Sequence, residues 1–472
     1  MVFSSLIFLY LFLPVCLLCY GLSPSVRVKN AILTVFSLIF YAWGEPVYIL
    51  LLLCSVTVNY LLGLGIGKCR EKPKASKALL ILGLVFNIGL LLTFKYSGFF
   101  AENLNRLLSL AGAGISLPVP KLTLPIGISF YTFQILSYII DLYWEKVDVQ
   151  RNPMNFLLYI SMFPQLIAGP IVRYSTIERE IRERKITLTD FSDGLTRLAI
   201  GLAKKVILAN HLSVIVDAFF GGSGTISAAG AWYTTAVYAM QIYFDFSGYS
   251  DMAIGMGRMF GFHFDENFRH PFLRRDISEF WQRWHISLGT FFRDYLLYVP
   301  IFGKRRKYGG LLLVWFCTGF WHGANWNFII WGLYFGLFVL IEQLIGKKRI
   351  KKIPLAIRHI YSKLVILVGF GIFYFEDLKK LGHYFGDLVG ANGNALIDDM
   401  TWLSMRNNLF LLIAAVICCF PLYDGLKKLA RRSVGAGYAV ETLQIVCNVL
   451  LLGVSSILLV DATNNPFLYF RF

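Results

Sequence analysis

The sequence predicts an all-α protein that crosses a membrane many times, and two observations support this fold class. Of its 472 residues, 57% are hydrophobic and only 15% are charged, whereas about a quarter of the residues of a soluble domain are charged. The hydrophobic residues form long continuous runs, each close to the roughly 20 residues that a helix needs to cross a bilayer. Backbone polar groups must be paired internally in lipid, and the runs do not alternate with polar residues. They therefore predict helices rather than barrel strands.

The apolar runs occur along the whole chain, without a Pro/Gly/Ser linker, a low-complexity tract or an internal repeat. We therefore expect one membrane domain over residues 1–472. The first run lacks a basic N-terminal region and contains Pro14, so we expect an uncleaved first span rather than a secretion signal. The expected segments are 2–22, 31–43, 46–66, 78–98, 123–144, 154–172, 195–220, 227–260, 309–345, 353–375, 408–423 and 437–461.

The formal net charge of +17 does not indicate a nucleic-acid partner, because the basic residues gather in the short connections between apolar runs. The main clusters are 68–77, 173–185, 304–307 and 347–352. The positive-inside rule assigns such clusters to the cytoplasm, and contact with anionic lipid is compatible with them. The eight cysteines lie mostly in apolar runs without metal-ligand spacing, so we expect neither a disulfide framework nor a metal site.

Two segments predict re-entrant hairpins rather than complete crossings. Segment 154–172 lies between basic connections and ends in Gly169-Pro170, which breaks a helix. Segment 309–345 is also bracketed by basic clusters, so we expect two half-length arms joined by a turn, which Gly319, Gly323 and the polar pair His322 and Asn325 place at the middle. Non-helical backbone at membrane depth requires a protein or cavity lining, so His322 should lie deep at a broken helix.

His322 is the leading candidate for a catalytic residue. A histidine inside a membrane is uncommon, and its unperturbed pKa near 6.5 suits a general base. The alternative is a buried histidine that only stabilises the turn, and the membrane context favours function. His285 is a second candidate, on an amphipathic interfacial helix expected near residues 276–298, with Phe280, Trp284 and Leu288 on one face. There a structural role is as good an interpretation as a functional one.

Further polar residues interrupt the segment 227–260. Gln241, Asp245 and Tyr249 share one helical face and either line a substrate path or have a structural role. Asp245 or Asp251 would be paired with an arginine such as Arg258 in the structural interpretation, which we slightly favour.

Three other groups of polar residues stand out in the sequence. Ser129, Thr132 and Gln134 are interpreted as helix-packing residues. Lys304 and Arg305 are mainly topogenic, with attraction of a phosphorylated donor as a second role. P-loop, dinucleotide-binding, GxSxG and HExxH motifs are all absent from the sequence.

The chain resembles the membrane-bound O-acyltransferases, and most of all the bacterial branch that acts in alginate O-acetylation and teichoic-acid D-alanylation. The resemblance runs almost end to end. One departure is Phe373-Tyr374-Phe375-Glu376-Asp377, where alginate-type members carry an arginine, which affects the expected acceptor or partner side. The shared strings are 2–5, 41–43, 125–130, 163–173, 245–251, 280–288, 319–324 and 465–472.

This resemblance implies a ring of about 11 transmembrane helices around a central tunnel, with re-entrant and interfacial helices. His322 matches the family's invariant histidine, and His285 matches the second active-site histidine of the branch. Trp321 and Asn325 would line the tunnel together with Gln241, Asp245 and Tyr249. The location implied is the bacterial cytoplasmic membrane.

The resemblance also implies acyl transfer from a cytoplasmic thioester to a cell-surface polysaccharide. Acetyl-CoA is the donor in alginate-type members and a carrier-protein thioester in D-alanylation members, and no permanently bound cofactor is expected. An extracytoplasmic SGNH-type acetyltransferase is an expected partner. We expect acetyl transfer, with His322 as general base and with His285 positioning the thioester or hydrogen-bonding the developing oxyanion. D-alanyl transfer, a glycan or lipid transporter and a non-catalytic scaffold are the alternatives.

Overall fold

The computed structural model describes residues 1–222, 224–297, 307–430, 433–460 and 467. All regular structure among these residues is helical, as the sequence predicts. The chain divides into two compact units, each described here by itself: unit 1 contains residues 1–194 and 256–265, and unit 2 contains residues 195–255 and 266–472. The prediction of one membrane domain over residues 1–472 stays a prediction.

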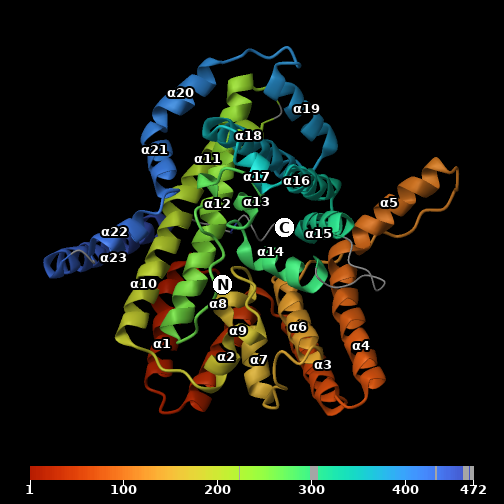
Figure 1. Ribbon diagram of the computed structural model, residues 1–472, viewed down its shortest axis with the longest axis vertical. Coiled ribbons are helices and arrows are strands. Elements are labelled where there is room, and N and C mark those ends of the chain that lie inside the picture. The colour runs from red at the N-terminus through yellow and green to blue at the C-terminus, as the bar shows by residue number, and fades with distance from the viewer. Residues whose placement is uncertain (223, 298–306, 431–432, 461–466, 468–472) are drawn as a thin grey trace. The chain divides into compact units, whose positions relative to one another are not determined.

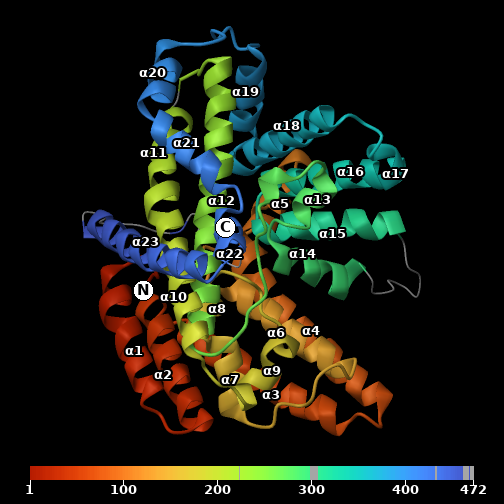
Figure 2. The same cartoon turned by 60° about the vertical axis from the view of Figure 1, so that its left-hand side comes forward.

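Unit 1 is a set of antiparallel helices in which α3, α4 and α6 pack together and α7 packs on α2 and α3 (Figures 1 and 2). Its helices are η1 (Phe8–Phe12), α1 (Leu13–Gly21), α2 (Val26–Gly44), α3 (Ile49–Lys68), α4 (Pro73–Leu91), η2 (Leu92–Tyr96), α5 (Ser97–Leu110), α6 (Ile128–Tyr143), α7 (Pro153–Ser161), α8 (Phe163–Leu166) and α9 (Tyr174–Arg182).

Unit 2 contains the predicted site residues. Its helices are α10 (Leu188–Ala203, from Leu195 on), η3 (Lys204–Ala209), α11 (Asn210–Phe220), α12 (Ala228–Met259), η4 (Pro271–Leu273), α13 (Ile277–Trp281), α14 (Ile286–Phe292), η5 (Arg293–Leu297), α15 (Lys307–His322), α16 (Trp326–Ile345), α17 (Lys347–Ile350), α18 (Leu355–Tyr374), α19 (Leu378–Val389), α20 (Asp399–Asn407), α21 (Leu409–Cys418), α22 (Leu422–Ala430) and α23 (Val434–Val460).

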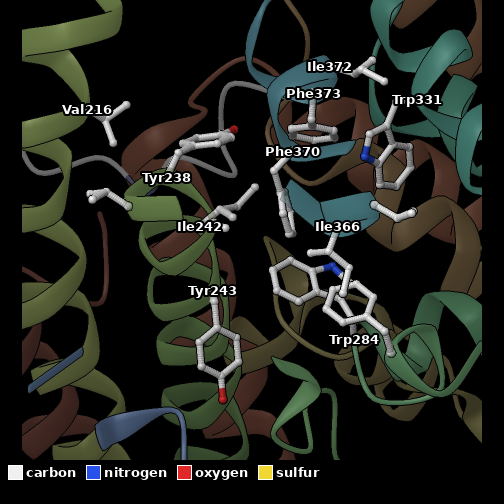
Figure 3. Packing of buried hydrophobic residues seen from close by; sticks show 14 of the residues in the cluster. Val216, Tyr238, Ile242, Tyr243, Trp284, Trp331, Ile366, Phe370, Ile372 and Phe373 are labelled. Carbon is white, nitrogen blue, oxygen red and sulfur yellow. The ribbon is translucent and has the colours of Figure 1, made fainter. Parts of the chain in front are cut away.

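The core of unit 2 forms where α12, α13, α16 and α18 meet. Figure 3 shows side chains of α12 and α18, such as Tyr238 and Phe370, in this core, together with Trp284 and Trp331. The ring of Trp284 lies 5.1 Å from that of Phe370 and 5.5 Å from that of Phe280, so the segment that carries His285 is part of the core.

Within the described residues, seven helical segments are long and apolar enough to cross a membrane, or up to eight if α20 and α21, bent by 63°, form one span. The protein is therefore a multi-pass helical membrane protein, and the larger count of about 11 stays a prediction. The expected first span stays a prediction, because its apolar helix, Phe8–Gly21, is shorter than these segments. The seven segments are Val26–Gly44, Ile49–Lys68, Pro73–Leu110, Leu188–Phe220, Trp326–Ile345, Leu355–Tyr374 and Val434–Val460.

Both predicted hairpin segments are broken in the structure. Residues 154–172 form α7 and α8, with a non-helical Met162 between them, and then leave the helix through Gly169 at φ 106°. Residues 309–345 form α15 and α16, joined by the expected turn at 323–325. The prediction of two half-length arms is wrong for α16, because its 20 residues have the length of a complete span.

Candidate active site

His322 is the last residue of α15, at the turn into α16 (Figure 1). Asn325 ends this turn as the N-cap of α16, and its side-chain oxygen accepts a hydrogen bond from the Trp326 backbone N–H at 2.8 Å. Partial negative charge gathers on the unpaired carbonyls at a helix C-terminus. The end of α15 therefore places the His322 ring beside this partial negative charge.

Glycines allow the two arms of the hairpin to lie in backbone contact. A methyl group on Gly319 would collide with the carbonyl oxygen of Phe328, and one on Gly332 would collide with that of Trp315. A methyl group on Gly323 would enter the Phe328 ring. Small residues at such positions bring helix backbones together, so these glycines determine the position of His322 against α16.

Three aromatic rings surround His322, which is 7% exposed. Its ring centroid lies 5.0 Å from that of Trp331 on α16 and 5.3 Å from that of Phe373 on α18, both nearly perpendicular. The ring centroid of Trp321, the preceding residue on α15, lies 5.1 Å from that of His322. These contacts hold the imidazole in one orientation in a largely apolar surrounding, where hydrogen bonds and charges act more strongly than in water.

Trp321 also connects His322 to the second predicted histidine. Its ring centroid lies 5.9 Å from that of His285, so the same indole contacts both imidazoles. The two histidines lie 37 positions apart in the sequence, His285 directly before α14 and His322 at the end of α15. The structure therefore brings His285, Trp321 and His322 together within unit 2.

His285 does not lie on the single helix expected near residues 276–298, and that expectation is wrong. The chain forms α13, then a break at 282–285, then α14 and η5. His285 occupies the left-handed region at φ 47° and is the N-cap of α14. A non-glycine residue there costs about 1–2 kcal/mol, and such strained residues cluster at functional sites.

Asn267 holds the break in place and was missed by sequence reasoning. Its backbone carbonyl accepts from the Ile286 N–H at 2.9 Å. Its side-chain oxygen accepts from the Ser287 hydroxyl at 2.9 Å and lies 3.2 Å from Nδ1 of His285. Asn267 is fully buried. The sequence gives no signal that Asn267 is buried and orients His285, because an asparagine in a stretch rich in charged residues is usually exposed.

Burial lowers the pKa of His285 to about 3. The side chain is 3% exposed and packs edge-on against Phe246 of α12, with ring centroids 4.6 Å apart. Because burial penalises the charged form of an imidazole, His285 is neutral at physiological pH. It can accept or donate one hydrogen bond at each nitrogen, but it carries no positive charge.

Glu342 fixes the start of α13 and was also missed. Its carboxylate accepts from the backbone N–H groups of Ile277 and Ser278 at 2.7 and 2.8 Å, and from the Ser278 hydroxyl. This joins α16 of the hairpin to the helix that leads to His285. Glu342 is the single acidic residue of segment 309–345, and a carboxylate inside an apolar run is itself a signal.

The predicted polar face of α12 is buried, since Gln241, Asp245 and Tyr249 are 7%, 2% and 1% exposed. The predicted pairing with an arginine is confirmed for Asp251, whose partner is Arg197, but the example Arg258 is wrong. Asp245 pairs with Lys205 at 2.6 Å, and Arg258 pairs with Asp193 at 3.3 Å. An ion pair of this kind supports the structural interpretation of Asp245.

Asp251 forms ion pairs with two basic residues, Arg197 at 2.9 Å and Lys204 at 2.6 Å. On the same helix, Phe246 contacts the His285 ring and Ser250 accepts from Asn267 at 3.0 Å. Neither of these two α12 residues was singled out from the sequence. Whether Gln241, Asp245 and Tyr249 line a substrate path stays a prediction.

Two predicted residues, Lys304 and Arg305, lie outside the described residues. Ser129, Thr132 and Gln134 are buried on α6, as packing residues are. Within the described part of the chain, no group of three or more His, Cys, Asp or Glu side chains is arranged to hold a metal ion.

Comparison with known proteins identifies the family. Residues 145–374, which include both histidines, match the model of the membrane-bound O-acyltransferase family. A probable alginate O-acetylase of Azotobacter vinelandii is 37% identical over the full length of both chains. A peptidoglycan O-acetyltransferase of Helicobacter pylori is 34% identical over 84% of this chain and 81% of its own. A teichoic acid D-alanyltransferase of Bacillus subtilis is 28% identical over 48% of this chain and 62% of its own.

The strings that carried the resemblance in the sequence lie, for the most part, within or beside this matched region. Membership does not depend on a short motif, because similarity above 30% identity extends over most or all of the chain in relatives of two kinds. The chain belongs to the membrane-bound O-acyltransferase family and is a multi-pass membrane acyltransferase.

Proposed function

We propose that this protein moves an acetyl group from a cytoplasmic thioester across the membrane for O-acetylation of a cell-surface polysaccharide. The observation that carries the proposal is the placement of His322 at the break of the α15–α16 hairpin, inside a ring of aromatic side chains. Full-length similarity to proteins named for O-acetylation supports acetyl as the acyl group. Alginate and peptidoglycan are the polymers in those relatives' names, and the acceptor of this chain belongs to the same class of glycan.

His322 acts as the general base. Its imidazole takes the proton of an acceptor hydroxyl while the hydroxyl oxygen attacks the thioester carbonyl carbon. The tetrahedral intermediate collapses with cleavage of the carbon–sulfur bond. The departing thiolate takes up the proton that His322 received from the acceptor hydroxyl. Holding both reactants in one water-poor site supplies orientation and limits hydrolysis of the thioester.

This reaction requires that the donor and the acceptor reach His322 from opposite faces of the membrane. A ring of about 11 helices around a central tunnel, in the bacterial cytoplasmic membrane, would let the donor approach from the cytoplasm and the acceptor from the other face. Acetyl-CoA is the proposed donor, with Lys304 and Arg305 near its phosphates. Asn325, Trp321, Gln241, Asp245 and Tyr249 are the proposed lining of the tunnel, and an SGNH-type acetyltransferase is the proposed extracytoplasmic partner.

The test uses the purified protein in lipid with radiolabelled acetyl-CoA. We expect release of coenzyme A by the wild type and a loss of about 100-fold or more in His322→Ala, since a positioned base contributes about 10²–10⁴-fold. His383→Ala, at a histidine with a side chain 51% exposed, is the matched control and should keep wild-type turnover. Equal turnover by His322→Ala and the wild type would overturn the assignment of the base.

D-alanyl transfer is the second candidate, supported by the similarity to the teichoic acid D-alanyltransferase. It predicts turnover with a D-alanyl carrier-protein thioester and none with acetyl-CoA. A transporter predicts glycan or lipid movement in vesicles without any acyl donor. Both alternatives are distinguished from the main proposal by supplying each donor separately to the same preparation.

A further inference from the structure

The environment of His285 determines which of its two ring nitrogens carries the proton. The starting point is the side-chain amide of Asn267, whose oxygen and nitrogen must first be told apart. The Ser287 backbone N–H, which can only donate, lies 3.3 Å from the position of Oδ1, and the Ser287 hydroxyl lies 2.9 Å from it. On its other side the amide nitrogen donates to the Ser250 hydroxyl at 3.0 Å. The amide therefore directs its oxygen toward His285.

This oxygen lies 3.2 Å from Nδ1 of His285. A carbonyl oxygen only accepts, so the hydrogen bond requires a proton on Nδ1. A neutral imidazole carries one proton, which leaves the lone pair on Nε2. The low pKa of His285 agrees with a ring that stays neutral in this site.

Several contacts hold this arrangement. Asn267 is fully buried, and its backbone carbonyl accepts from the Ile286 N–H at 2.9 Å, next to His285. His285 itself is confined between Phe246 and Trp321, whose ring centroids lie 4.6 and 5.9 Å away. The backbone of His285 is in the left-handed region, at φ 47°. Ring rotation that exchanged the two nitrogens would have to break the hydrogen bond to Asn267 in a closed apolar setting.

We infer that Asn267 is a positioning residue that holds His285 in the tautomer with Nε2 unprotonated, so that His285 accepts a hydrogen bond from a substrate O–H or N–H and does not donate one to the oxyanion. The inference rests on the proposed function, because it assigns His285 a part in acyl transfer. It replaces the expectation that His285 hydrogen-bonds the developing oxyanion, since a donor is needed there. Suitable substrate groups are the acceptor hydroxyl and the amide N–H groups of a thioester carrier arm.

The first test measures the tautomer directly, by nitrogen NMR of the protein labelled with ¹⁵N-histidine in lipid. The chain has seven histidines, and the signals of His285 are those lost in His285→Gln. We expect Nδ1 to appear as a protonated nitrogen and Nε2 as an unprotonated one at neutral pH. A protonated Nε2, or a ring that is doubly protonated at pH 7, would overturn the inference.

The second test uses variants of Asn267. In Asn267→Asp, the carboxylate still accepts from Nδ1, so the tautomer is kept. Its negative charge favours the imidazolium form and raises the pKa of His285 by about 1–3 units. We therefore expect the pH at which Nε2 of His285 takes up a proton, read from its ¹⁵N signal, to move upward by about one unit or more, with wild-type-like turnover on the alkaline side. In Asn267→Leu the Nδ1 acceptor is lost, and we expect both tautomers in the spectrum and about ten-fold or greater loss of kcat/KM.

The control is Asn59→Asp, the same change at a buried asparagine that is hydrogen-bonded to Asn87 rather than to a histidine. It should show any folding cost of a buried carboxylate without a shift of the pH at which His285 takes up a proton. An unshifted ¹⁵N titration of His285 in Asn267→Asp, or an unchanged tautomer in Asn267→Leu, would contradict the role of Asn267. Full turnover in His322→Ala would instead contradict the proposed function and leave the NMR result on His285 intact, so the two failures are distinguishable.

Discussion

At the scale of single residues, the site depends on polar groups whose partners lie on other helices. His322 is enclosed by rings from α16 and α18, and His285 is oriented by Asn267. The buried charges follow the same rule, since Asp245 of α12 is paired with Lys205 of η3 at 2.6 Å, with side chains 3% and 5% exposed. Removal of one member of such a pair leaves a charge in an apolar region without this partner, which is costly.

We therefore predict that Lys205→Met lowers the free energy of unfolding by about 3–5 kcal/mol, seen as a fall in the melting temperature in detergent. The double variant Lys205→Met with Asp245→Leu should recover most of the loss, because it removes both charges. Arg182→Met is the control, since Arg182 is 47% exposed in its pair with Glu178 and such pairs contribute about 0–1 kcal/mol. Similar losses in the two single variants would contradict the prediction.

At the scale of secondary structure elements, the α15–α16 hairpin and the α13–α14 break are the two devices that position the histidines. The hairpin depends on backbone contact at Gly319 and Gly332. The break depends on Glu342, which accepts from the first N–H groups of α13, and on the ion pair of Arg358 with Asp276, the N-cap of α13, at 3.0 Å. Because Glu342 lies on α16 and Arg358 on α18, the element that leads to His285 is attached to the hairpin that carries His322.

We predict that Gly319→Ala separates the arms of the hairpin, because its methyl group would collide with the Phe328 carbonyl. Overpacking of this kind costs about 1–3 kcal/mol, and displacement of His322 should lower turnover by more than the fraction of protein that unfolds. Thermal unfolding and acetyl-CoA turnover measured on one preparation check both effects. Gly453→Ala on α23, where an added methyl meets no atom within 4 Å, should keep both values; equal behaviour of the two variants would rule out the packing argument.

At the scale of the whole molecule, hydropathy and charge determine how the chain is placed in a bilayer. Seven segments have the length and composition of complete spans, and the basic residues gather in a few connections. In unit 2, α18 is one such span, preceded by the cluster 347–352 and followed by α19. The positive-inside rule places the basic end of α18 in the cytoplasm, so the chain after Tyr374 should be on the other side.

This topology predicts opposite labelling of two exposed positions in unit 2. In a background without the eight native cysteines, Lys348→Cys should react with a membrane-impermeant maleimide only after the cytoplasmic side is opened. Ala391→Cys, between α19 and α20, should react in intact cells. Both residues are exposed, so access depends on the side of the membrane. Labelling of both from one side would show that α18 does not cross the bilayer.

Much of this organisation could be predicted from the sequence. Composition and the length of the apolar runs determined the class of a helical membrane protein, because the free energy of burying a segment in lipid is nearly a sum over its own residues. Gly319 and Gly323, together with the polar pair His322 and Asn325, likewise located the turn of the hairpin. The polar face of α12 was correctly placed inside the protein, since unpaired polar groups are excluded from lipid.

Tertiary structure alone decided the partners within that framework. Periodicity indicated that Asp245 is buried, but only the packing of α12 against η3 selects Lys205 instead of Arg258. The continuous amphipathic pattern at 276–298 predicted one helix, whereas hydrogen bonds that Asn267, outside this segment, accepts hold His285 in a left-handed break. Local sequence reports the preference of a segment for water, lipid or helix. The identity of a side chain's partner depends on which helices pack together, and that is a property of contacts between residues far apart in the chain.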